Sequence, residues 1–490
     1  MTEIIIVIGS GFSSLAAATS LADEGKKVTV LEKNSQTGGR ARQFSASGFT
    51  FDMGPSWYWM PDVFDAYFER FGKKVSDYYE LVRLDPSYQV VFQDKEFVDI
   101  PAAYSELKAL FEKYEKGSGA ELDKFLAEGE YKYEVGMNDL VHKPSQSILE
   151  FAQWRVISGV FKLQLFSSIS KHIRKHFTHP KLIELLEFPV LFLGAKPQDT
   201  PALYSLMNYA DIKLGTWYPM GGMHKIVEGM TTLAKEKGVE FVLDCEVKKL
   251  EVKNGKVSKA ITTKGNFEGT HFISGADYHH TDKHLLDAEY HNYTEQYWDS
   301  RKMAPSSLLF YLGVDTRVKN LLHHNLFFDE SFNQHAKEIY DDPQWPSNPL
   351  FYVCVPSITD KSVAPEGQEN VFILVPVAPD LKDDEETREK YYHIVMDRLE
   401  SLTNQKIREH VIYKKSYAHA DFKSDYHAFK GNAYGLANTL TQTAILKPNL
   451  RNKKLKNLFY TGQLTTPGPG VPPSLISGQV VAKEVLKTLA

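Results

Sequence analysis

The first thirty residues follow a pattern that predicts a strand, a helix and a second strand. Residues 4–8 form a continuous β-branched run, which is typical of a parallel strand buried on both faces. Residues 12–24 carry small and apolar side chains that suit a helix packed on a sheet, and Gly25 ends this segment before the apolar run 28–31. This order predicts a β-α-β unit with a right-handed crossover.

The pattern changes twice further along the chain. Residues 60–214 are rich in aromatic side chains and in helix-length periodic segments, such as 61–72 and 147–176. Strand patterns return near 240–243, 247–252, 271–274, 308–314 and 371–376, with a helix near 386–402 and a final strand, Gly/Pro loop and helix over 458–489. We expect a nucleotide-binding domain built from separated segments, interrupted by a second domain.

Composition and charge exclude several classes of protein. The chain has 490 residues, a 42% apolar content and a net charge of −5, and we find no Lys/Arg block of the kind that binds nucleic acid. Two cysteines, Cys245 and Cys354, make no disulfide framework and fit a reducing cytoplasm. No apolar run reaches the length of about 20 residues that a membrane-spanning helix needs.

A glycine-rich turn joins the first predicted strand to the first predicted helix. Gly9-Ser10-Gly11 ends the strand, and Glu32 follows at the end of the next strand. Such glycines let the backbone approach a pyrophosphate at a helix N-terminus, and an acid about 20 residues on accepts a hydrogen bond from a ribose. The motif predicts a dinucleotide, and the acid disfavours NADP. Ser14 replaces the third glycine, so we expect slightly looser helix–strand packing.

The residues after Glu32 favour FAD over NAD. Gly38-Gly39-Arg40 allows a second close backbone approach and supplies a fork of donors for phosphate oxygens. Gly54, in Asp52-Met53-Gly54-Pro55-Ser56, could let the chain pass close to a ring system. We find no second glycine-rich strand–turn–helix unit, so no separate nicotinamide site is expected.

These motifs together resemble the flavin amine oxidase-type enzymes and, within them, the bacterial carotenoid (phytoene) desaturases. The resemblance continues through residues 218–223, 254–257, 273–277, 458–463 and 467–472, with Gly275 standing where the family has asparagine. It implies non-covalently bound FAD, with Val247 on the adenine side. It also implies that the C-terminal helix aims its N-terminus at the flavin ring, which would stabilise the reduced anion.

The predicted cofactor-binding residues come from five segments of the chain. They are Gly9, Ser10, Gly11, Phe12, Ser13, Glu32, Lys33, Gly39, Arg40, Gly54, Pro55, Ser56, Val247, Gly462, Gln463 and Val471. No catalytic residue and no metal ligand is assigned. The predicted fold is α/β, with a Rossmann-like FAD-binding domain over 1–75, 215–285 and 425–490, and an inserted α+β substrate domain over 76–214 and 286–424.

Apolar clusters suggest the type of substrate, and a basic helix suggests a membrane from which the protein takes it. Aromatic and aliphatic side chains gather at 57–60, 161–166 and 188–193, where they could line a tunnel for a long hydrocarbon or simply form core. Residues 161–177 place apolar side chains on one face and Lys171, His172, Arg174, Lys175 and His176 around it. This pattern suits either an anionic membrane surface or a solvated helix face. We expect a cytoplasmic protein at the inner face of the cell membrane.

The resemblance implies an FAD-dependent carotenoid desaturase, which transfers hydride from an allylic carbon of a C40 polyene to flavin N5. Phytoene desaturation is favoured, and a hydroxycarotenoid 3,4-desaturase is the close alternative. A carotene isomerase, an amine or porphyrinogen oxidase, and a flavin-free lipid carrier of the GDP-dissociation-inhibitor type remain open. A quinone or oxygen is the expected electron acceptor.

Overall fold

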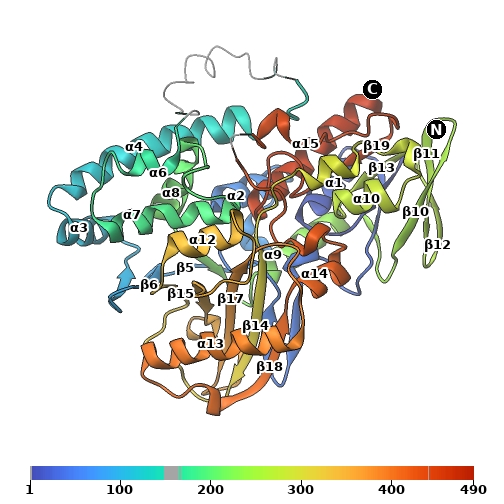
Figure 1. Ribbon diagram of the computed structural model, residues 1–490. Helices are drawn as coiled ribbons and strands as arrows, with labels where there is room; N and C mark the ends of the chain where they lie inside the picture. Colours follow the sequence, from blue (N-terminus) through green and yellow to red (C-terminus); the bar gives the residue numbers. More distant parts are fainter. Residues whose placement is uncertain (1–2, 148–149, 151–163, 165–166, 440, 490) are drawn as a thin grey trace.

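A computed structural model describes residues 3–147, 150, 164, 167–439 and 441–489 (Figure 1). Within them, five strands form a parallel sheet in the order β19-β13-β1-β2-β9. Their bounds are β1 Ile4–Ile8, β2 Lys27–Leu31, β9 Glu240–Val242, β13 His271–Ser274 and β19 Leu458–Tyr460. The predicted α/β class and opening β-α-β unit are confirmed.

Helices α1 Phe12–Asp23, α9 His224–Glu236 and α15 Val471–Leu489 pack on one face of the parallel sheet. The other face contacts α10 Tyr278–His284, α11 Glu295–Asp299 and a small antiparallel sheet. Helices α1 and α15 touch closely, because a Cβ at Gly478 would lie 2.0 Å from the Ser13 carbonyl oxygen and 2.9 Å from Ala16 Cβ. The small residues of α1 therefore allow the last helix of the chain to pack on the first.

A small antiparallel sheet lies at one end of the molecule (Figure 1). It consists of β10 Val247–Lys253, β11 Lys256–Thr262 and β12 Gly265–Glu268. Two short ribbons complete this half, one from β3 Gln43–Ala46 and β4 Phe49–Asp52, the other from β5 Leu81–Arg83 and β8 Trp217–Pro219.

The largest sheet in the described residues has seven strands, in the order β18-β14-β17-β16-β15-β6-β7. They are β6 Tyr88–Phe92, β7 Phe97–Ile100, β14 Ser306–Val314, β15 His324–Phe328, β16 Phe351–Cys354, β17 Glu369–Val377 and β18 Val411–Tyr417. Alternate side chains face opposite sides: Leu308 and Phe310 join the core under α13 Glu385–Thr403, whereas Leu309 faces the other way. That second face looks toward the rest of the molecule and forms part of the site described below.

Helices gather beside the large sheet, at the upper left of Figure 1. They are α2 Pro61–Glu69, α3 Tyr104–Tyr114, α4 Ser118–Val135, α6 Ile169–Ile173, α7 Pro180–Glu187 and α8 Leu206–Tyr209. Two further helices, α12 Phe332–Tyr340 and α14 His419–Tyr426, were not predicted from the sequence. The strands of the parallel sheet fall within the segments assigned to the FAD-binding domain, but the domain boundaries themselves stay a prediction.

The predicted basic amphipathic helix is described only in part, because 148–149, 151–163 and 165–166 lie outside the described residues. In the described part, Ile169, Ile173 and Phe177 are buried and Lys171, Arg174 and Lys175 are exposed. The placement of His172 among the surface charges was wrong, since this ring is buried and stacks on Phe125. In the described residues, no helix is both long enough and apolar enough to span a membrane.

Candidate functional site

A continuous pocket of about 450 Å³ runs from the ends of the parallel strands to the inner face of the seven-stranded sheet. Every residue predicted to bind the cofactor lines this pocket. These are Gly9, Ser10, Gly11, Phe12, Ser13, Glu32, Lys33, Gly39, Arg40, Gly54, Pro55, Ser56, Val247, Gly462, Gln463 and Val471. The parallel topology explains their meeting, because the carboxyl ends of β1, β2, β13 and β19 lie at one edge of the sheet.

Glu32 is fixed at the end of β2 by hydrogen bonds to both of its oxygens. Oε2 accepts from the Ser10 N–H at 2.8 Å and from the Ser10 hydroxyl at 2.6 Å. Oε1 accepts from the Asn34 N–H at 2.8 Å and from Asn34 Nδ2 at 2.9 Å. These four hydrogen bonds hold the glycine turn against the strand end and occupy the acceptor positions of the carboxylate, so a ribose hydroxyl at this wall of the pocket would share or replace one of them.

Two glycines shape the wall of the pocket near this turn. A Cβ built on Gly11, the N-cap of α1, would meet no atom within 4 Å, so open space lies directly in front of the helix N-terminus. A Cβ on Gly54 would lie 2.7 Å from the Arg40 carbonyl oxygen, so the chain there passes too closely for any larger residue. The first opening suits a pyrophosphate, because free N–H groups and the helix dipole favour anions there.

Arg40 lies across the pocket with part of its guanidinium unpaired. Nη2 donates to the Asn432 carbonyl oxygen at 3.3 Å, and the guanidinium lies 5.0 Å from the centre of the Tyr426 ring. Nε is buried and makes no hydrogen bond within the described residues. Burial lowers the pKa of Arg40, and the nearby Asp277 carboxylate opposes this shift. An unpaired donor of this kind fits a negatively charged ligand group.

The adenine side of the predicted cofactor is closed by two histidines. His280 and His427 stack with ring centres 3.9 Å apart, and both line the pocket beyond Glu32. Burial lowers the pKa of His280 to about 3, so this ring stays neutral. Lys33 Nζ lies 3.3 Å from His427 Nε2. A flat neutral pair beside the ribose carboxylate suits an aromatic base better than a second phosphate.

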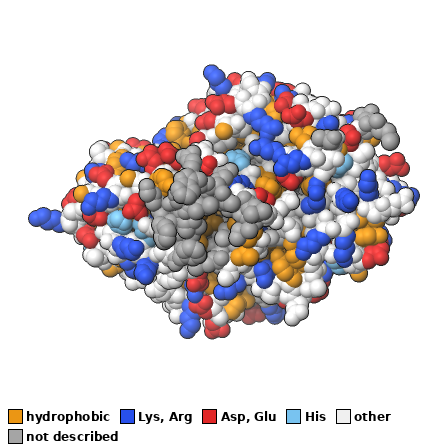
Figure 2. Space-filling model, turned by 90° about the horizontal axis from the view of Figure 1, so that it is seen from above, with side chains coloured by type: hydrophobic (Ala, Val, Ile, Leu, Met, Phe, Trp, Pro, Cys, Tyr) orange, Lys and Arg blue, Asp and Glu red, His pale blue; other side chains and the backbone are white. Residues whose placement is uncertain are grey.

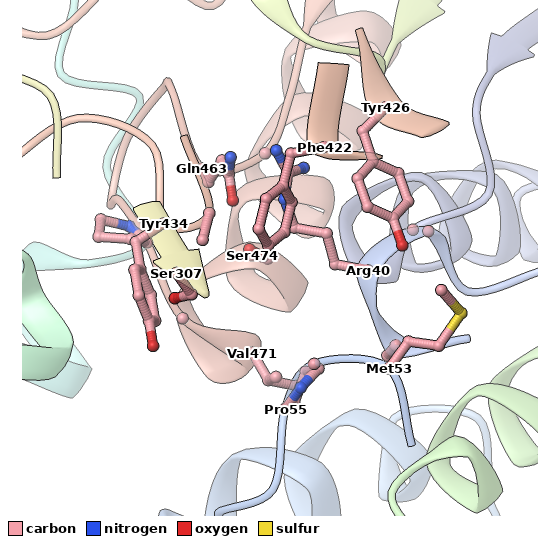
Figure 3. A pocket seen from close by; sticks show the side chains of 18 of the residues that line it. Arg40, Met53, Pro55, Ser307, Phe422, Tyr426, Tyr434, Gln463, Val471 and Ser474 are labelled. Carbon is pink, nitrogen blue, oxygen red and sulfur yellow. The ribbon is translucent and has the colours of Figure 1, made fainter. Parts of the chain in front are cut away.

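The C-terminal loop and the start of α15 close the other side of the pocket (Figure 3). Val471 lies next to Pro55 there, and both line the pocket. Pro472 and Pro473 have no N–H and the Ser474 N–H bonds to the Gly470 carbonyl oxygen, so Val471 supplies the backbone donor at the helix start. The predicted helix N-terminus therefore does reach the pocket, with fewer donors than an ordinary first turn.

Beyond these residues the pocket becomes mainly apolar. Its walls there come from β14–β17, α12 and the segment after Gly54. They include Trp57, Trp59, Met60, Phe188, Leu309, Leu326, Phe328, Phe332, Ala336, Ile339, Leu350 and Leu374. Of the predicted tunnel segments, 57–60 and 188–193 each contribute, although Tyr58 instead points to Tyr79, with their hydroxyls 2.9 Å apart. Residues 161–163 and 165–166 of the third segment lie outside the described residues.

Comparisons with known proteins agree with this arrangement. The family model of flavin containing amine oxidoreductase matches residues 12–486. The chain belongs to this family. It is 41% identical to a carotenoid 3,4-desaturase of Haloarcula japonica, over 100% of this chain and 99% of that protein. It is 30% identical to a zeta-carotene-forming phytoene desaturase of Myxococcus xanthus, over 98% of this chain and 93% of that protein.

Solved structures share the fold at low identity. Cyclohexylamine oxidase from Brevibacterium oxydans superposes with a TM-score of 0.61 at 12% identity, covering 100% of both chains. An oxidoreductase from Methanosarcina mazei gives 0.63 at 16% identity, covering 98% of this chain and 100% of that one. The predictions of an FAD cofactor and of an oxidoreductase are thereby confirmed for this flavin-containing oxidoreductase, and the flavin-free carrier is set aside.

Asp52 explains why two distant motifs of the flavoprotein occur together. Its buried carboxylate accepts hydrogen bonds from the Met223 N–H at 2.6 Å and the His224 N–H at 3.0 Å, at the N-terminus of α9. Burial raises the pKa of Asp52 to about 6, although these two hydrogen bonds lower it. Motif 52–56 and motif 218–223 are therefore two parts of one helix cap.

Several pocket residues of the oxidoreductase were missed from the sequence. They are chiefly Ser307, Tyr340, Tyr352, Phe422, Tyr426 and Tyr434. In the sequence these side chains look like ordinary core or surface positions, because no glycine turn or charge pattern marks them. Only the approach of the large sheet to the parallel sheet brings them to the pocket.

Proposed function

We propose that this protein is an FAD-dependent carotenoid desaturase that forms a carbon–carbon double bond next to a hydroxylated end of its substrate, as in 3,4-desaturation. Full-length similarity to carotenoid desaturases, the first at 41% identity, supports the reaction class. Support for the hydroxylated end comes from two neighbouring hydroxyl side chains in the apolar part of the pocket.

Ser307 is the observation that carries this choice. Its side chain is 1% exposed and lines the pocket, and its Oγ makes no hydrogen bond of normal geometry within the described residues. Tyr434 lies beside it (Figure 3), and burial raises the pKa of its phenol, which therefore stays protonated. The Ser307 hydroxyl interacts with the Tyr434 phenol and has no other partner among the described residues, so a substrate hydroxyl would complete its hydrogen bonding where a hydrocarbon cannot.

The remaining residues align the substrate and exclude water. Bound FAD would supply an acceptor for the hydride, and the substrate would lose a proton from the adjacent carbon as the double bond forms. Apolar walls from Leu309, Leu326 and Leu374 hold the polyene and keep the site dry. Ser307 and Tyr434 would fix how far the chain slides past Val471 and Pro55, and so which bond reacts. A quinone or oxygen then takes the electrons.

Turnover of two matched substrates tests the proposal. The purified protein is given a C40 carotenoid with a hydroxylated end, or the same polyene without the hydroxyl, in liposomes. We expect at least tenfold higher kcat/KM for the hydroxylated carotenoid, and Ser307→Ala should remove most of this preference, because one hydrogen bond contributes about 1 kcal/mol. Ser306→Ala is the control for general damage. It removes the neighbouring hydroxyl, which donates to the Gly431 carbonyl oxygen.

Equal or faster turnover of the unhydroxylated polyene, or of phytoene, would contradict the proposed end-group preference. Phytoene desaturation is the second candidate, supported by the 30% identity to the Myxococcus enzyme. Chromatography of the products separates the two, since 3,4-desaturation lengthens the polyene at one end.

We propose further that the protein works at the inner face of the cell membrane, where carotenoids dissolve. Lys171 and Lys175 are exposed after the segment that lies outside the described residues. Arg174 is less suited to this role, because it forms an ion pair with the buried Glu187. Figure 2 shows Lys and Arg side chains spread over this face of the molecule, interspersed with hydrophobic and acidic ones.

Binding to anionic liposomes tests the membrane proposal. Lys171→Gln combined with Lys175→Gln should lower co-sedimentation several-fold, at about 1 kcal/mol per charge near the surface. Lys256→Gln combined with Lys361→Gln, at exposed positions elsewhere, is the matched control. Equal sedimentation of both double variants would remove these lysines from the docking surface.

A further inference from the structure

Two histidines and a cysteine meet behind the wall of the pocket. His324 begins β15 and pairs in register with Cys354, the last residue of β16. His323 precedes the strand, and its ring centre lies 4.4 Å from that of His324. The three side chains are 4%, 0% and 4% exposed for His323, His324 and Cys354. Strand pairing therefore gathers three metal-binding side chains in a place sealed from solvent.

The free nitrogens of both rings belong to this cluster. His323 Nδ1 lies 2.8 Å from Thr359 Oγ1, and His324 Nδ1 lies 2.6 Å from the Tyr352 hydroxyl oxygen. Nε2 of each ring is buried without a hydrogen-bond partner among the described residues. Histidines that bind metals commonly have their second nitrogen held in this way, while the first points to the ion. Two such orphaned nitrogens beside one thiol need a ligand.

We propose that His323, His324 and Cys354 bind a zinc ion. Each offers one ligand atom, and these three atoms lie within 4.8 Å of one another. Tetrahedral zinc, with bonds of about 2.0–2.1 Å to nitrogen and 2.3 Å to sulfur, needs ligand atoms roughly 3.3–3.8 Å apart. Small rotations of the two rings and of the thiol bring the three ligand atoms from their present separations to these zinc distances.

A neighbouring cavity provides the fourth ligand. It has a volume of about 20 Å³ and is lined by His323, Cys354, Asp52 and Ser56 among others. A cavity of about 10–15 Å³ holds one water, so a water molecule completes the coordination. Three protein ligands and one enclosed water then surround the ion.

The charge around the cluster suits a cation. Zinc with one thiolate and two neutral imidazoles carries a net charge of +1. The Asp360 carboxylate interacts electrostatically with His323, and Asp52 lines the same small cavity. Zinc displaces the thiol proton of Cys354 when it binds. Two carboxylates thus lie near the positive charge that the ion brings.

The location gives the ion a structural role. The small cavity is also lined by Gly54 and Pro55, which line the large pocket on their other side. An ion held at the ends of β15 and β16 therefore fastens these two strands to each other, directly behind the segment expected to contact the flavin ring. This inference does not depend on which carotenoid the enzyme uses.

Metal analysis of tag-free holoenzyme tests the site. Because the ligands are buried, zinc is supplied in the growth medium, and protein freed of loose metal by gel filtration is measured by mass spectrometry. We expect close to one zinc per chain in the parent. Cys354→Ser and His324→Gln should each retain at least tenfold less. Cys245→Ser and His176→Gln, the latter in a second group with Glu128 and His172, should match the parent.

A parent protein with less than a tenth of an equivalent of zinc would overturn the proposal, as would full retention in Cys354→Ser. The FAD content of each variant shows whether it has folded. If both ligand variants fail to fold, cadmium-grown Cys245→Ser protein decides: a thiolate-to-cadmium absorption band supports the site, because Cys354 is then the remaining cysteine, and its absence refutes it.

Discussion

The two ends of the large pocket are built from different materials. At the end near Glu32, glycines, backbone N–H groups and a few fixed polar side chains form the surface. At the other end, aliphatic and aromatic side chains from β14–β17 and α12 form it, with Ser307 and Tyr434 as neighbouring polar points. The polar end must match individual polar atoms of a single ligand. The apolar end must only match the shape of its ligand and exclude water. This difference decides what mutations do at each end.

The largest effect is expected from Glu32→Ala at the polar end. The variant loses an acceptor for the ribose and also releases Ser10 and Asn34. Hydrogen bonds to charged groups contribute about 1.5–3 kcal/mol, so FAD should bind roughly 10- to 100-fold more weakly. Flavin absorbance per protein after gel filtration measures this. Glu240→Ala, on the exposed side of β9, should keep its flavin; unchanged flavin in Glu32→Ala would refute the ribose role.

At the apolar end, the expected loss is of activity and not of cofactor. Ala336 on α12 is 9% exposed and lines the pocket, so Ala336→Phe places a ring where the polyene should lie. Desaturation should fall roughly 30-fold in kcat/KM, at about 2 kcal/mol for overpacking, while FAD content stays at the parent level. Ala420→Phe, at an exposed position of α14, is the control. Loss of flavin in Ala336→Phe would mean that the two ends are not separate.

A buried lysine behind the C-terminal loop shows how an unpaired charge near the polar end lowers folding stability. Lys447 is 6% exposed, and its Nζ has no partner in the described residues. A Cβ at Gly468 would lie 3.1 Å from this nitrogen. Burial lowers the pKa of Lys447 from 10.5 to about 7. The folded state therefore binds the proton less tightly than the unfolded chain, and stability rises as the pH increases from about 7 to about 10.5.

Lys447→Met should accordingly raise the melting temperature most at pH 6, where the parent carries a buried ammonium. The gain, on the order of 2 kcal/mol, should shrink toward zero near pH 10. Differential scanning calorimetry across this range measures it, with the exposed Lys456→Met as control. A destabilised or flavin-depleted variant would instead place this amine among the cofactor contacts.

The polar end could be predicted from the sequence because its requirements fall on the backbone. Gly9, Gly11 and Gly54 stand where a side chain would block an approach, and Glu32 follows at the spacing that a β-α-β unit fixes. The apolar end could not. Ser307 and Leu326 sit in strands whose two faces are both buried, so the face that lines a pocket looks like the face that forms a core.

Helices α12 and α14 were missed for a related reason. Phe332–Tyr340 and His419–Tyr426 are short, and their apolar faces contact the pocket and neighbouring loops more than one continuous core. A helix of eight or nine residues is too short to be stable by itself, so packing against the rest of the chain decides its conformation. The long helix α13 Glu385–Thr403 was predicted, because its 19 residues contain no glycine or proline that would end it.

The smallest predicted effect concerns two departures from the family motifs that lie in contact. Ser14 replaces the third glycine of the dinucleotide motif, and Gly275 stands where the family has asparagine. A Cβ at Gly275 would lie 2.0 Å from Ser14 Oγ, so the serine occupies the space that a larger residue at 275 would need. The missing side chain at 275 makes room for the hydroxyl, and looser helix–strand packing at Ser14 stays a prediction.

A double-mutant cycle tests this compensation. Gly275→Asn alone should destabilise the protein by about 1 kcal/mol through overpacking, and Ser14→Gly alone should leave a small gap. Because the two positions share one space, the double variant should recover most of the loss, which thermal unfolding of the holoenzyme measures as a positive coupling. Strictly additive effects would show that the two substitutions arose independently. A recovered stability would show that even the polar end, with its strict motif, tolerates exchange when volume is conserved between touching residues.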